Sequence, residues 1–397
     1  MSALRSLRLK PEAERRLRLG HSWVYANEFE GKLGALGLQA GQLVELITAK
    51  GRSLGAAYVN PNVLIAGRLL QTPSDGFDVR GWLQQRIRSA LALRQRLGVA
   101  RAGRLIFGES DGLPGLVVDR YGPLLSAQLG TAGMAAWADQ IADELRRIEG
   151  IDALVWRNDA AGRELEGLPR EVQVAFGEVS EPIWIDENGA RFGISPVSGQ
   201  KTGWFYDQRD NRAALMPFVA GARVLDLFSY GGGWGVCSAV HGASSALCVD
   251  SSSAALEAVQ RNAHASGVGE RVSVLDVDAF DACRQLRDAG ERFDVVVVDP
   301  PAFIKRKKDA EAGTLAYRRI NEAALKLVAD GGLIVSCSCS HHFSADALLD
   351  ALNRAACALG LRLRVLKRLA QSADHPIHPG MPETEYLKGF LAEVRRP

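Results

Sequence analysis

The stretch VVVVDPPAF, Val295–Phe303, decides the fold of the C-terminal half of this 397-residue chain. Four consecutive valines predict a strand that is buried on both faces, because a half-exposed strand would alternate apolar and polar residues. Asp299 follows the valines directly, and the two prolines behind it form a rigid turn that offers no amide donors. The stretch therefore predicts a buried parallel strand with a carboxylate at its carboxyl end.

Further apolar runs of the same kind occur from about residue 217 onward: RVLDLFS, SALCVDS, VSVLDVD and GLIVSCS. Helical patterns such as SSAALEAVQRNAHASG and LAYRRINEAALKLVADGG separate them. Doubly apolar strands that alternate with helices indicate an α/β fold, with a Rossmann-like parallel sheet covered on both faces. In such sheets the ligand binds beyond the carboxyl ends of the strands, so the residues that follow each strand are the informative ones.

The first three strands end in aspartates, and the first leads into the glycine-rich turn DLFSYGGGWG, Asp226–Gly235. Glycines here let the backbone approach a ligand, but the turn is neither a P-loop nor a clean GxGxxG, and a tight turn without a ligand is the alternative. Asp250 lies 24 residues beyond Asp226, where an acid can accept hydrogen bonds from ribose hydroxyls. Asp278 could hold an adenine amino group, with Phe280 flanking the ring. Each of these aspartates could equally be a helix cap.

The N-terminal half predicts two smaller domains. Residues 1–72 alternate short strand-like runs with glycine turns and form a small β module with a basic first helix. The turn cluster TPSDG, Thr72–Gly76, marks a boundary, after which residues 73–180 form an α+β domain and residues 181–397 the α/β domain. One helix of the middle domain has a single apolar stripe, made of Leu83, Ile87, Ala90, Leu91 and Leu97.

Basic residues are clustered, although the formal net charge is only +2. The segment Gly81–Arg104 contains six arginines and no acid, the N-terminal LRSLRLKPEAERRLRLG is basic, and KRKK occupies Lys305–Lys308. One such run is usually a solvated helix face, but three together favour a polyanionic partner.

Location and redox state follow from what the sequence lacks. No apolar run is long enough to span a bilayer, and the N-terminus has no signal-peptide core, so we expect a cytoplasmic protein. The six cysteines all lie in the C-terminal half without a CxxC pair, which does not indicate a disulfide framework.

The stretch SCSCSHHF, Ser336–Phe343, could be a metal site, a redox pair, a nucleophile or core packing. Strand alternation puts Cys337 and Cys339 on the same face, so periodicity does not separate them. Cys339 is nearer the carboxyl end of its strand, where substrates bind. Zinc ligands are usually two to four residues apart, and two histidines on one strand end cannot close a tetrahedral site alone. We therefore expect no metal, and we interpret His341 and His342 as polar residues after the strand.

Several motifs together carry a resemblance to a known family: GHSWVYANE, KTGWFYDQRDNR, VLDLFSYGGGWG, VDSSSAALEAVQRNA, DVVVVDPPAF, SCSCSHH and PETEYLKG. In this order they resemble the class I S-adenosylmethionine-dependent methyltransferases that make 5-methylcytosine in large-subunit (23S) ribosomal RNA. That family has an N-terminal PUA domain and a small central domain, and the likeness covers nearly the whole chain. One departure is visible, because Gly231 stands where the family usually has threonine.

The resemblance implies a cofactor, a nucleophile and an RNA partner. S-adenosylmethionine would be held at the strand ends by Asp226, Phe228, Ser229, Tyr230, Gly231, Gly233, Asp250, Ser251, Asp278, Ala279 and Asp299. A Cys339 thiolate would attack carbon 6 of cytosine, with Asp299 as the second catalytic residue at the methyl-donor end. The RNA would contact Arg86, Arg94, Lys305, Lys307, Gln208 and Arg209. RNA would present a single-stranded or flipped cytosine, and a homodimer is implied by the resemblance alone.

Two alternatives stay open from the sequence. The same Asp-Pro-Pro turn could serve methylation of a purine nitrogen without covalent catalysis. The chain could also be a non-catalytic RNA-binding factor in ribosome assembly, although the set of four strand-end aspartates together with Cys339 argues against it. A dehydrogenase is disfavoured, because Asp-Pro-Pro has no role in hydride transfer.

Overall fold

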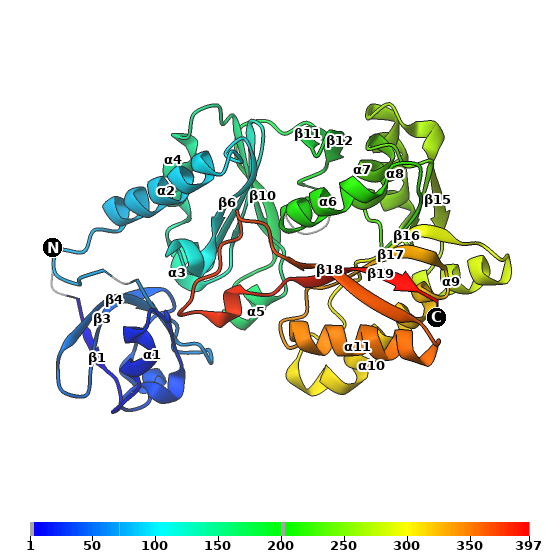
Figure 1. Ribbon diagram of the computed structural model, residues 1–397. Helices are drawn as coiled ribbons and strands as arrows, with labels where there is room; N and C mark the ends of the chain where they lie inside the picture. The colour runs from blue at the N-terminus through cyan, green and yellow to red at the C-terminus, as the bar shows by residue number, and fades with distance from the viewer. Residues whose placement is uncertain (1–3, 71, 198, 200–202, 397) are drawn as a thin grey trace. The chain divides into compact units, whose positions relative to one another are not determined.

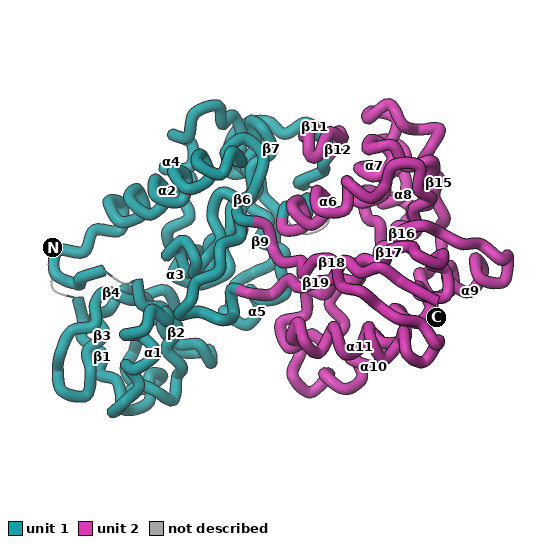
Figure 2. The backbone as a smooth tube through the Cα atoms, viewed as in Figure 1, with its two compact units in different colours: residues 1–183, 194–206, 373–384 teal, residues 184–193, 207–372, 385–397 magenta. Residues whose placement is uncertain are grey.

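The computed structural model describes residues 4–70, 72–197, 199 and 203–396, which divide into two compact units. Unit 1 contains residues 1–183, 194–206 and 373–384, and unit 2 contains residues 184–193, 207–372 and 385–397, as Figure 2 shows in two colours. Lys201 and Thr202 of the KTGWFYDQRDNR motif lie outside the described residues.

Unit 2 is built on one mixed sheet with the strand order β15-β14-β13-β16-β17-β19-β18. Its strands are β13 (Arg223–Leu227), β14 (Ser245–Asp250), β15 (Val272–Asp276), β16 (Phe293–Val298), β17 (Val328–Ser338), β18 (Arg362–Ala370) and β19 (Lys388–Arg395). Its helices are α6 (Arg209–Leu215), α7 (Gly233–Val240), α8 (Ser253–Ala265), α9 (Ala279–Asp288), α10 (Ala310–Leu325) and α11 (Ala345–Ala358).

The five strands expected to be parallel are parallel, which confirms the predicted α/β class. Val295–Val298 of β16 are all buried, as a strand with helices on both faces requires. Helices α10 and α11 lie on one side of the sheet in Figure 1, and α6, α7 and α8 on the other. The buried side chains of α9, α10 and α11 form one cluster with β16 and β17.

The sheet extends beyond the five predicted parallel strands and is mixed at one edge. β19 runs antiparallel to β17, and β18 antiparallel to β19. Neither strand was predicted from the sequence. The helical pattern predicted before β17 is also too long, because α10 ends at Leu325 and the strand begins at Val328. Gly331 and Gly332 lie inside the long strand, and the ladder has a register shift opposite them, between Phe293 and Val295.

Unit 1 contains the N-terminal β module. Its five-stranded sheet has the order β1-β3-β4-β5-β2, with β1 (Ser6–Arg8), β2 (Trp23–Val24), β3 (Gln42–Ile47), β4 (Ser53–Val59) and β5 (Gly67–Leu69). A short helix α1 (Glu14–Arg18) follows β1. The module has its own cluster of buried side chains, including Leu7, Val44, Leu46 and Phe29.

The second sheet of unit 1 has the order β10-β9-β8-β7-β6. Its strands are β6 (Ala102–Phe107), β7 (Leu116–Tyr121), β8 (Leu124–Leu129), β9 (Ala153–Asn158) and β10 (Glu171–Phe176), and its helices are α2 (Val79–Arg96), α3 (Ala132–Ala136), α4 (Ala138–Arg146) and α5 (Gly162–Leu165). The predicted stripe of α2 buries Leu83, Ile87 and Ala90, whereas Leu97 lies past the helix end and is 38% exposed. A two-stranded sheet, β11 (Ile183–Glu187) and β12 (Ala190–Ile194), follows in the chain, and its residues 184–193 belong to unit 2.

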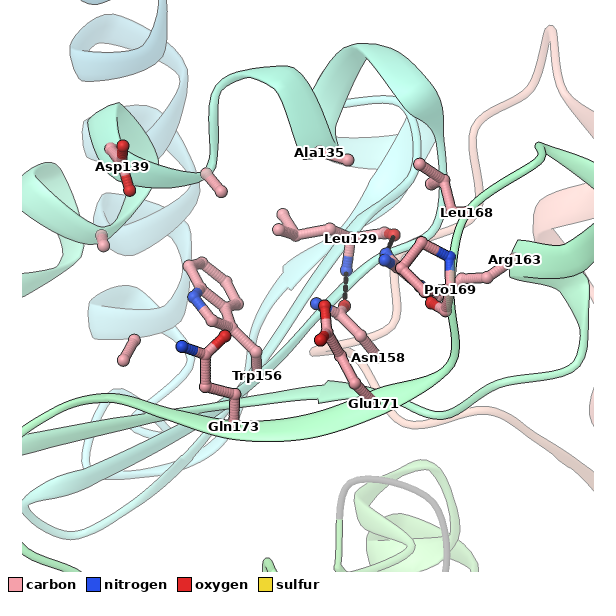
Figure 3. A pocket seen from close by; sticks show the side chains of 13 residues that line it. Leu129, Ala135, Asp139, Trp156, Asn158, Arg163, Leu168, Pro169, Glu171 and Gln173 are labelled. Atoms are coloured by element: carbon pink, nitrogen blue, oxygen red, sulfur yellow. Dashed lines mark hydrogen bonds between the residues drawn. The ribbon is translucent and has the colours of Figure 1, made fainter.

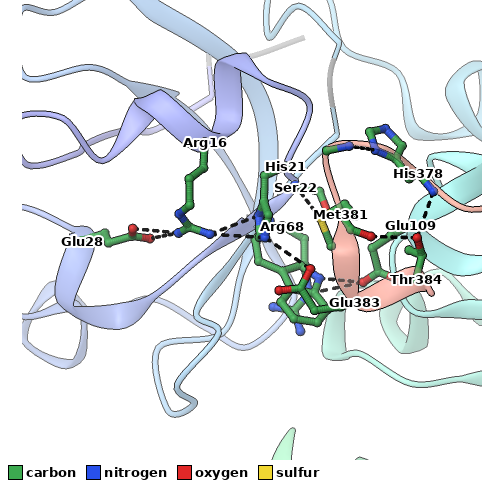
Figure 4. A network of polar contacts seen from close by, with 12 residues as sticks. Arg16, His21, Ser22, Glu28, Arg68, Glu109, His378, Met381, Glu383 and Thr384 are labelled. Carbon is green, nitrogen blue, oxygen red and sulfur yellow. Dashed lines mark hydrogen bonds and ion pairs between the residues drawn. The ribbon is translucent and has the colours of Figure 1, made fainter. Parts of the chain in front are cut away.

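Residues 373–384 connect β18 to β19 in the sequence, but they pack within unit 1 (Figure 4). The Ser22 amide donates to the Met381 sulfur at 3.2 Å, and His21 lies 3.7 Å from the Glu383 carboxylate. His375 is buried in this segment, and its Nδ1 lies 2.9 Å from Asp374 Oδ1. The predicted division into domains 1–72, 73–180 and 181–397 stays a prediction. Residues 373–384 lie within the third of these ranges and belong to unit 1.

Candidate active site

The carboxylate at the end of β16 is held by two donors. Gln208 Nε2 donates to Asp299 Oδ1 at 2.9 Å, and Trp234 Nε1 donates to Asp299 Oδ2 at 3.1 Å. Burial raises the pKa of Asp299 to about 6, while the two hydrogen bonds and Arg212 act in the lowering direction and Asp207 in the raising direction. Asp299 can therefore exchange a proton near neutral pH.

The orientation of the Gln208 amide is fixed by a chain of hydrogen bonds. Asn211 Nδ2 donates to Gln208 Oε1 at 2.6 Å, and the Ala370 amide donates to Asn211 Oδ1 at 3.3 Å. Because Asn211 occupies the oxygen of Gln208, the amide nitrogen is the group that faces Asp299. The segment before α6 thus positions a donor at the strand end.

The glycine-rich turn after β13 has unusual backbone geometry. Phe228 and Tyr230 have positive φ angles of 63° and 48°, and Gly232 has a φ of 78°. Non-glycine residues rarely adopt this conformation, and such strain concentrates at functional sites. A Cβ at Gly232 would lie 2.9 Å from the Val236 side chain, so glycine is required there for close packing. The hydroxyl of buried Ser229 has no hydrogen-bond partner among the described residues.

Asp226 lies fully buried at the start of this turn. Its Oδ2 accepts the amide of Gly235 at 2.9 Å, near the N-terminus of α7, whereas Oδ1 has no partner among the described residues. Burial raises the pKa of Asp226 to about 7, against the lowering effect of the Gly235 amide. A Cβ at position 235 would lie 2.4 Å from the Cys248 sulfur, so the helix approaches β14 closely only because residue 235 is glycine.

The predicted ribose residue, Asp250, is the last residue of β14, and the predicted adenine residue, Asp278, lies shortly after the end of β15. Asp250 Oδ2 accepts the amide of Tyr230 at 2.9 Å, which ties the glycine-rich turn to the end of β14. Asp278 is exposed and accepts the Phe280 amide at 2.8 Å as the N-cap of α9, so the cap that the sequence left as an alternative is present. Ser251 is exposed and Ala279 is buried.

The stretch SCSCS divides into two sets of side chains at the end of β17. Ser338 Oγ donates to Tyr317 Oη at 2.8 Å, and Ser340 Oγ lies 2.9 Å from the same phenol oxygen. Ser340 Oγ also accepts the Ile304 amide at 3.1 Å, which joins the turn behind Asp299 to the end of β17. The serines therefore fix this strand end against α10.

The two cysteines differ in environment. In the parallel pairing of β16 and β17, Val298 lies opposite Ser336, so Cys337 is level with Asp299 and Cys339 lies beyond the strand end. Cys337 is fully buried, and burial raises the pKa of its thiol well above the usual value, with Asp299 adding to the effect. Cys339 is half-buried. Only Cys339 of this pair combines access with a place past the carboxyl edge of the sheet.

The residues predicted to bind RNA are not equally available. Lys305 and Lys307 are exposed. Arg86 is half-buried, and Arg209 lies mostly buried with its Nε 3.5 Å from Glu187. Gln208 is buried beside Asp299.

Arg94 does not fit the predicted phosphate contact. It is 0% exposed, and its guanidinium forms a bidentate pair with Asp111 at 2.6 and 2.8 Å. It also donates to the carbonyl of Arg104 at 2.9 Å. A buried and paired guanidinium offers no charge to a polyanion, so Arg94 is a structural residue of unit 1.

Other interpretations of the polar residues can be compared with the structure. Among the described residues no group of three or more histidine, cysteine, aspartate or glutamate side chains could hold a metal ion. His341 and His342 are exposed after β17, and the His341 ring lies 5.6 Å from that of Tyr386. No helix in the described part of the chain is long and apolar enough to cross a membrane.

A cavity of about 360 Å³ lies in unit 1, between α3, α4 and β10 (Figure 3). Its lining includes Trp156, Asn158 and Glu171, and none of the predicted site residues. Asn158 Oδ1 accepts a hydrogen bond from the Leu129 amide at 2.9 Å, so this oxygen stabilises the sheet.

Four site residues escaped the sequence analysis: Trp234, Asn211, Tyr317 and Lys388. Trp234 stands inside the quoted GGGWG and Lys388 inside YLKG, so the motifs that contain them were visible. Their contacts with Asp299 and with the end of β17 depend on residues 65 and 48 positions away, which no local pattern reveals.

Comparison with known proteins agrees with this geometry. Residues 161–384 match the family described as S-adenosylmethionine-dependent methyltransferase, and residues 7–72 match the PUA-like domain. The strand-end site thus defines a methyltransferase of the S-adenosylmethionine-dependent class. The chain belongs to the family of the curated proteins named ribosomal RNA large subunit methyltransferase I. Those of Shewanella denitrificans and Shewanella frigidimarina are 36% and 35% identical to it, over 98% of this chain and 99% of each relative.

Solved structures share the fold. A protein assigned as a methyltransferase and crystallised with SAH superposes with a TM-score of 0.84 at 20% identity, over 98% of this chain and 100% of that one. A tRNA m1G37 methyltransferase of M. jannaschii reaches a TM-score of 0.51 at 17% identity, over 71% of this chain and 77% of that one. At these identities the likeness extends to the fold alone.

The residues at the strand ends fit S-adenosylmethionine as the cofactor. The turn has the positive φ angles described above, which would let its backbone approach a ligand. Asp226 Oδ1 and the Ser229 hydroxyl are buried polar atoms without partners among the described residues, and Asp250 is the last residue of β14. Buried polar atoms normally have hydrogen-bond partners, so such atoms indicate a place for a polar ligand.

Proposed function

We propose that this protein methylates carbon 5 of a cytosine in large-subunit ribosomal RNA through a covalent adduct with Cys339. The relatives that share the whole length of the chain are named for large-subunit ribosomal RNA, which supports the substrate. The choice of carbon 5 rests on one observation. A half-buried thiol lies just past the end of β17, beside the strand that ends in Asp299.

Carbon 5 of cytosine needs activation because the aromatic ring is a poor nucleophile. The Cys339 thiolate adds to carbon 6, an S–C bond forms, and the electrons of the carbon 5–carbon 6 double bond move to carbon 5. S-adenosylmethionine supplies the methyl group that carbon 5 then accepts. A base removes the proton left on carbon 5, the double bond forms again, and the S–C bond breaks to return the thiolate.

We assign the base role to Asp299. Its position at the end of β16 is level with the last residues of β17, from which Cys339 follows. The pKa of about 6 that burial produces is close to the working pH, which is where a general base is most efficient. Gln208 and Trp234 hold the two carboxylate oxygens in place.

The RNA is expected to contact the exposed Lys305 and Lys307, which follow the Asp-Pro-Pro turn, and the PUA-like module. The target cytosine has to be single-stranded or flipped out to reach the strand ends. A ribosomal RNA substrate also favours a cytoplasmic location, and we retain the homodimer as part of the proposal.

The test uses unmodified 23S ribosomal RNA, labelled S-adenosylmethionine and identification of the methylated nucleoside. We expect 5-methylcytidine with wild-type protein and with Cys337→Ala, and no product with Cys339→Ala. RNA that contains 5-fluorocytosine should trap wild-type protein as an adduct that survives denaturation and maps to the peptide with Cys339, because fluorine cannot leave as the proton does.

Three results would overturn the proposal. A methylated purine as the product would favour nitrogen methylation without covalent catalysis. Full activity of Cys339→Ala would remove the nucleophile. No transfer to any ribosomal RNA or ribosomal particle would favour a non-catalytic role.

A further inference from the structure

A lysine is buried in the sheet next to the proposed nucleophile. Lys388 begins β19 and lies directly opposite Ser338 in the antiparallel pairing of β17 and β19. It is 9% exposed, between Leu387 and Gly389, which are also buried. Lysine is almost never buried unless its charge is paired, so this position needs an explanation.

The ammonium group is held at the backbone around Cys339. Lys388 Nζ donates to the carbonyl oxygen of Ser340 at 2.6 Å. Ser338, opposite Lys388, and Ser340, its acceptor, are the two neighbours of Cys339 in the chain. The hydroxyls of both serines contact the Tyr317 hydroxyl on α10, so the backbone on each side of Cys339 is held in place.

A buried ammonium is costly without a negative partner. The groups that act on Lys388 in the direction of its charged form are Cys339 and Glu385, with Cys339 the larger influence. Glu385 is exposed, and its charge is screened by solvent. The groups whose charges interact with Cys339 include Lys388, Tyr317 and Cys337, and of these three Lys388 is the cation.

The interaction between two charges is reciprocal. A thiolate that favours the ammonium form of Lys388 is itself favoured by that ammonium to the same extent. Burial lowers the pKa of Lys388 to about 8, and the ammonium form is therefore still dominant at neutral pH. A cation beside a thiol increases the thiolate fraction, which is the reactive form.

We propose that Lys388 is a positioning residue that keeps Cys339 in the thiolate form. This inference rests on the proposed function, since it concerns the nucleophile of that reaction. The inference also accounts for two residues of the motif YLKG. The lysine stabilises the Cys339 thiolate, and the glycine leaves room for the sulfur of Cys337, which would lie 2.8 Å from a Cβ at position 389.

The direct test measures the reactivity of the thiol without RNA. Iodoacetamide labelling between pH 5 and pH 10, with peptide mass spectrometry, gives a rate profile for Cys339 and for the exposed Cys357 on α11 as an internal reference. In wild-type protein we expect Cys339 to react at lower pH than Cys357. In Lys388→Met its profile should move to higher pH, with labelling at pH 7 about tenfold slower, while Cys357 is unchanged.

Lys388→Arg and Lys367→Met are the matched controls. Arginine keeps the charge and should retain labelling within about threefold of wild type, and Lys367 is an exposed lysine on β18 whose loss should change nothing. For methyl transfer, Lys388→Met should lower kcat at pH 7 and recover part of it at pH 9, which a purely structural lesion would not do.

An unchanged Cys339 profile in Lys388→Met would overturn the inference. If Lys388→Met and Lys388→Arg both fail to fold, the comparison of Cys339 with Cys357 in wild-type protein decides. A Cys339 that is no more reactive than Cys357 below pH 8 would also overturn the inference. Failure of the proposed function is separate: a purine product together with a shifted Cys339 profile would reject cytosine methylation while the Lys388–Cys339 interaction stands.

Discussion

Cys337 on β17 and Gly389 on β19 lie directly opposite each other, and the sulfur of Cys337 fits because residue 389 has no side chain. A Cβ at position 389 would lie 2.8 Å from this sulfur and 3.0 Å from the carbonyl oxygen of Ser336. The buried thiol and the glycine therefore form one packing unit beside Asp299.

Gly389→Ala should destabilise the protein by about 1–3 kcal/mol, as overpacking usually does. Cys337→Ala alone should cost about 1 kcal/mol from the small cavity that it leaves. In the double variant the alanine methyl group occupies space that the sulfur vacates, so the total loss should be smaller than the sum by more than about 0.5 kcal/mol. Urea denaturation of the four proteins gives the cycle, and strict additivity would show that the two residues are not coupled.

The carboxylate of Asp299 should set the acid limit of activity. Its pKa is raised to about 6 by burial, and the proposed base is the deprotonated form, so activity should fall as the pH drops through about 6. Trp234→Phe removes the donor to Oδ2 but keeps an aromatic ring. Because that hydrogen bond favours the carboxylate, its loss should move the acid limb to higher pH by about one pH unit.

The pH dependence of kcat for wild type and Trp234→Phe checks this prediction. Trp82→Phe, a buried tryptophan of unit 1, is the control and should leave the profile in place. An acid limb that moves to lower pH in Trp234→Phe, or that does not move, would show that Asp299 is not the titrating group.

Substitutions of Arg94 and Arg96 should affect stability differently, because Arg94 is a buried arginine of α2 and Arg96 an exposed one. Arg94→Met leaves Asp111 without its bidentate partner, and breaking a buried ion pair typically costs about 3–5 kcal/mol. Arg96 is exposed near the end of the same helix, and Arg96→Met should change stability by less than about 0.5 kcal/mol. Urea unfolding measures both. A stable Arg94→Met protein that had lost RNA affinity would restore the RNA-binding prediction for this residue.

Lys305 and Lys307 should contribute to RNA affinity through charge. Each is exposed, so alanine substitution should leave the fold intact while weakening RNA binding and reducing the slope of log K against log salt concentration by about one per lost phosphate contact. Lys367→Ala is the matched exposed control on β18. Filter binding at several salt concentrations provides the slopes, and equal slopes for all variants would place the RNA elsewhere.

Much of the fold could be predicted because the signals are local. The continuous apolar runs of β13, β14 and β16 announce a sheet covered on both faces, and the glycine-rich turn and strand-end aspartates identify its functional edge. The antiparallel edge could not be predicted in the same way. β18 has a mostly exposed and charged sequence, RLRVLKRLA, and its pairing with β19 is decided by a partner 18 or more residues away.

The site shows the same division at the level of single residues. Asp226, Asp250 and Asp299 follow apolar runs, and their places at strand ends need only the alternation of strand and helix. Arg94 was misjudged because a basic helix face in a sequence does not disclose that Asp111 will bury one of its arginines. The sequence shows that a side chain is charged, but only the packed structure shows whether that charge is exposed to solvent or paired with a carboxylate.

The sequence by itself determined the class of sheet, the acidic strand ends and the cysteine pair at Ser336–Ser340, because backbone periodicity and burial act over neighbouring residues. The tertiary structure decided which cysteine is accessible and which groups surround it. Cys337 and Cys339 are equivalent by alternation, but the pairing with β16 and β19 buries Cys337 against Gly389 and leaves Cys339 past the strand end beside Lys388. Electrostatics and burial depend on residues brought together from distant parts of the chain, and these distinguish two thiols that the sequence presents as alike.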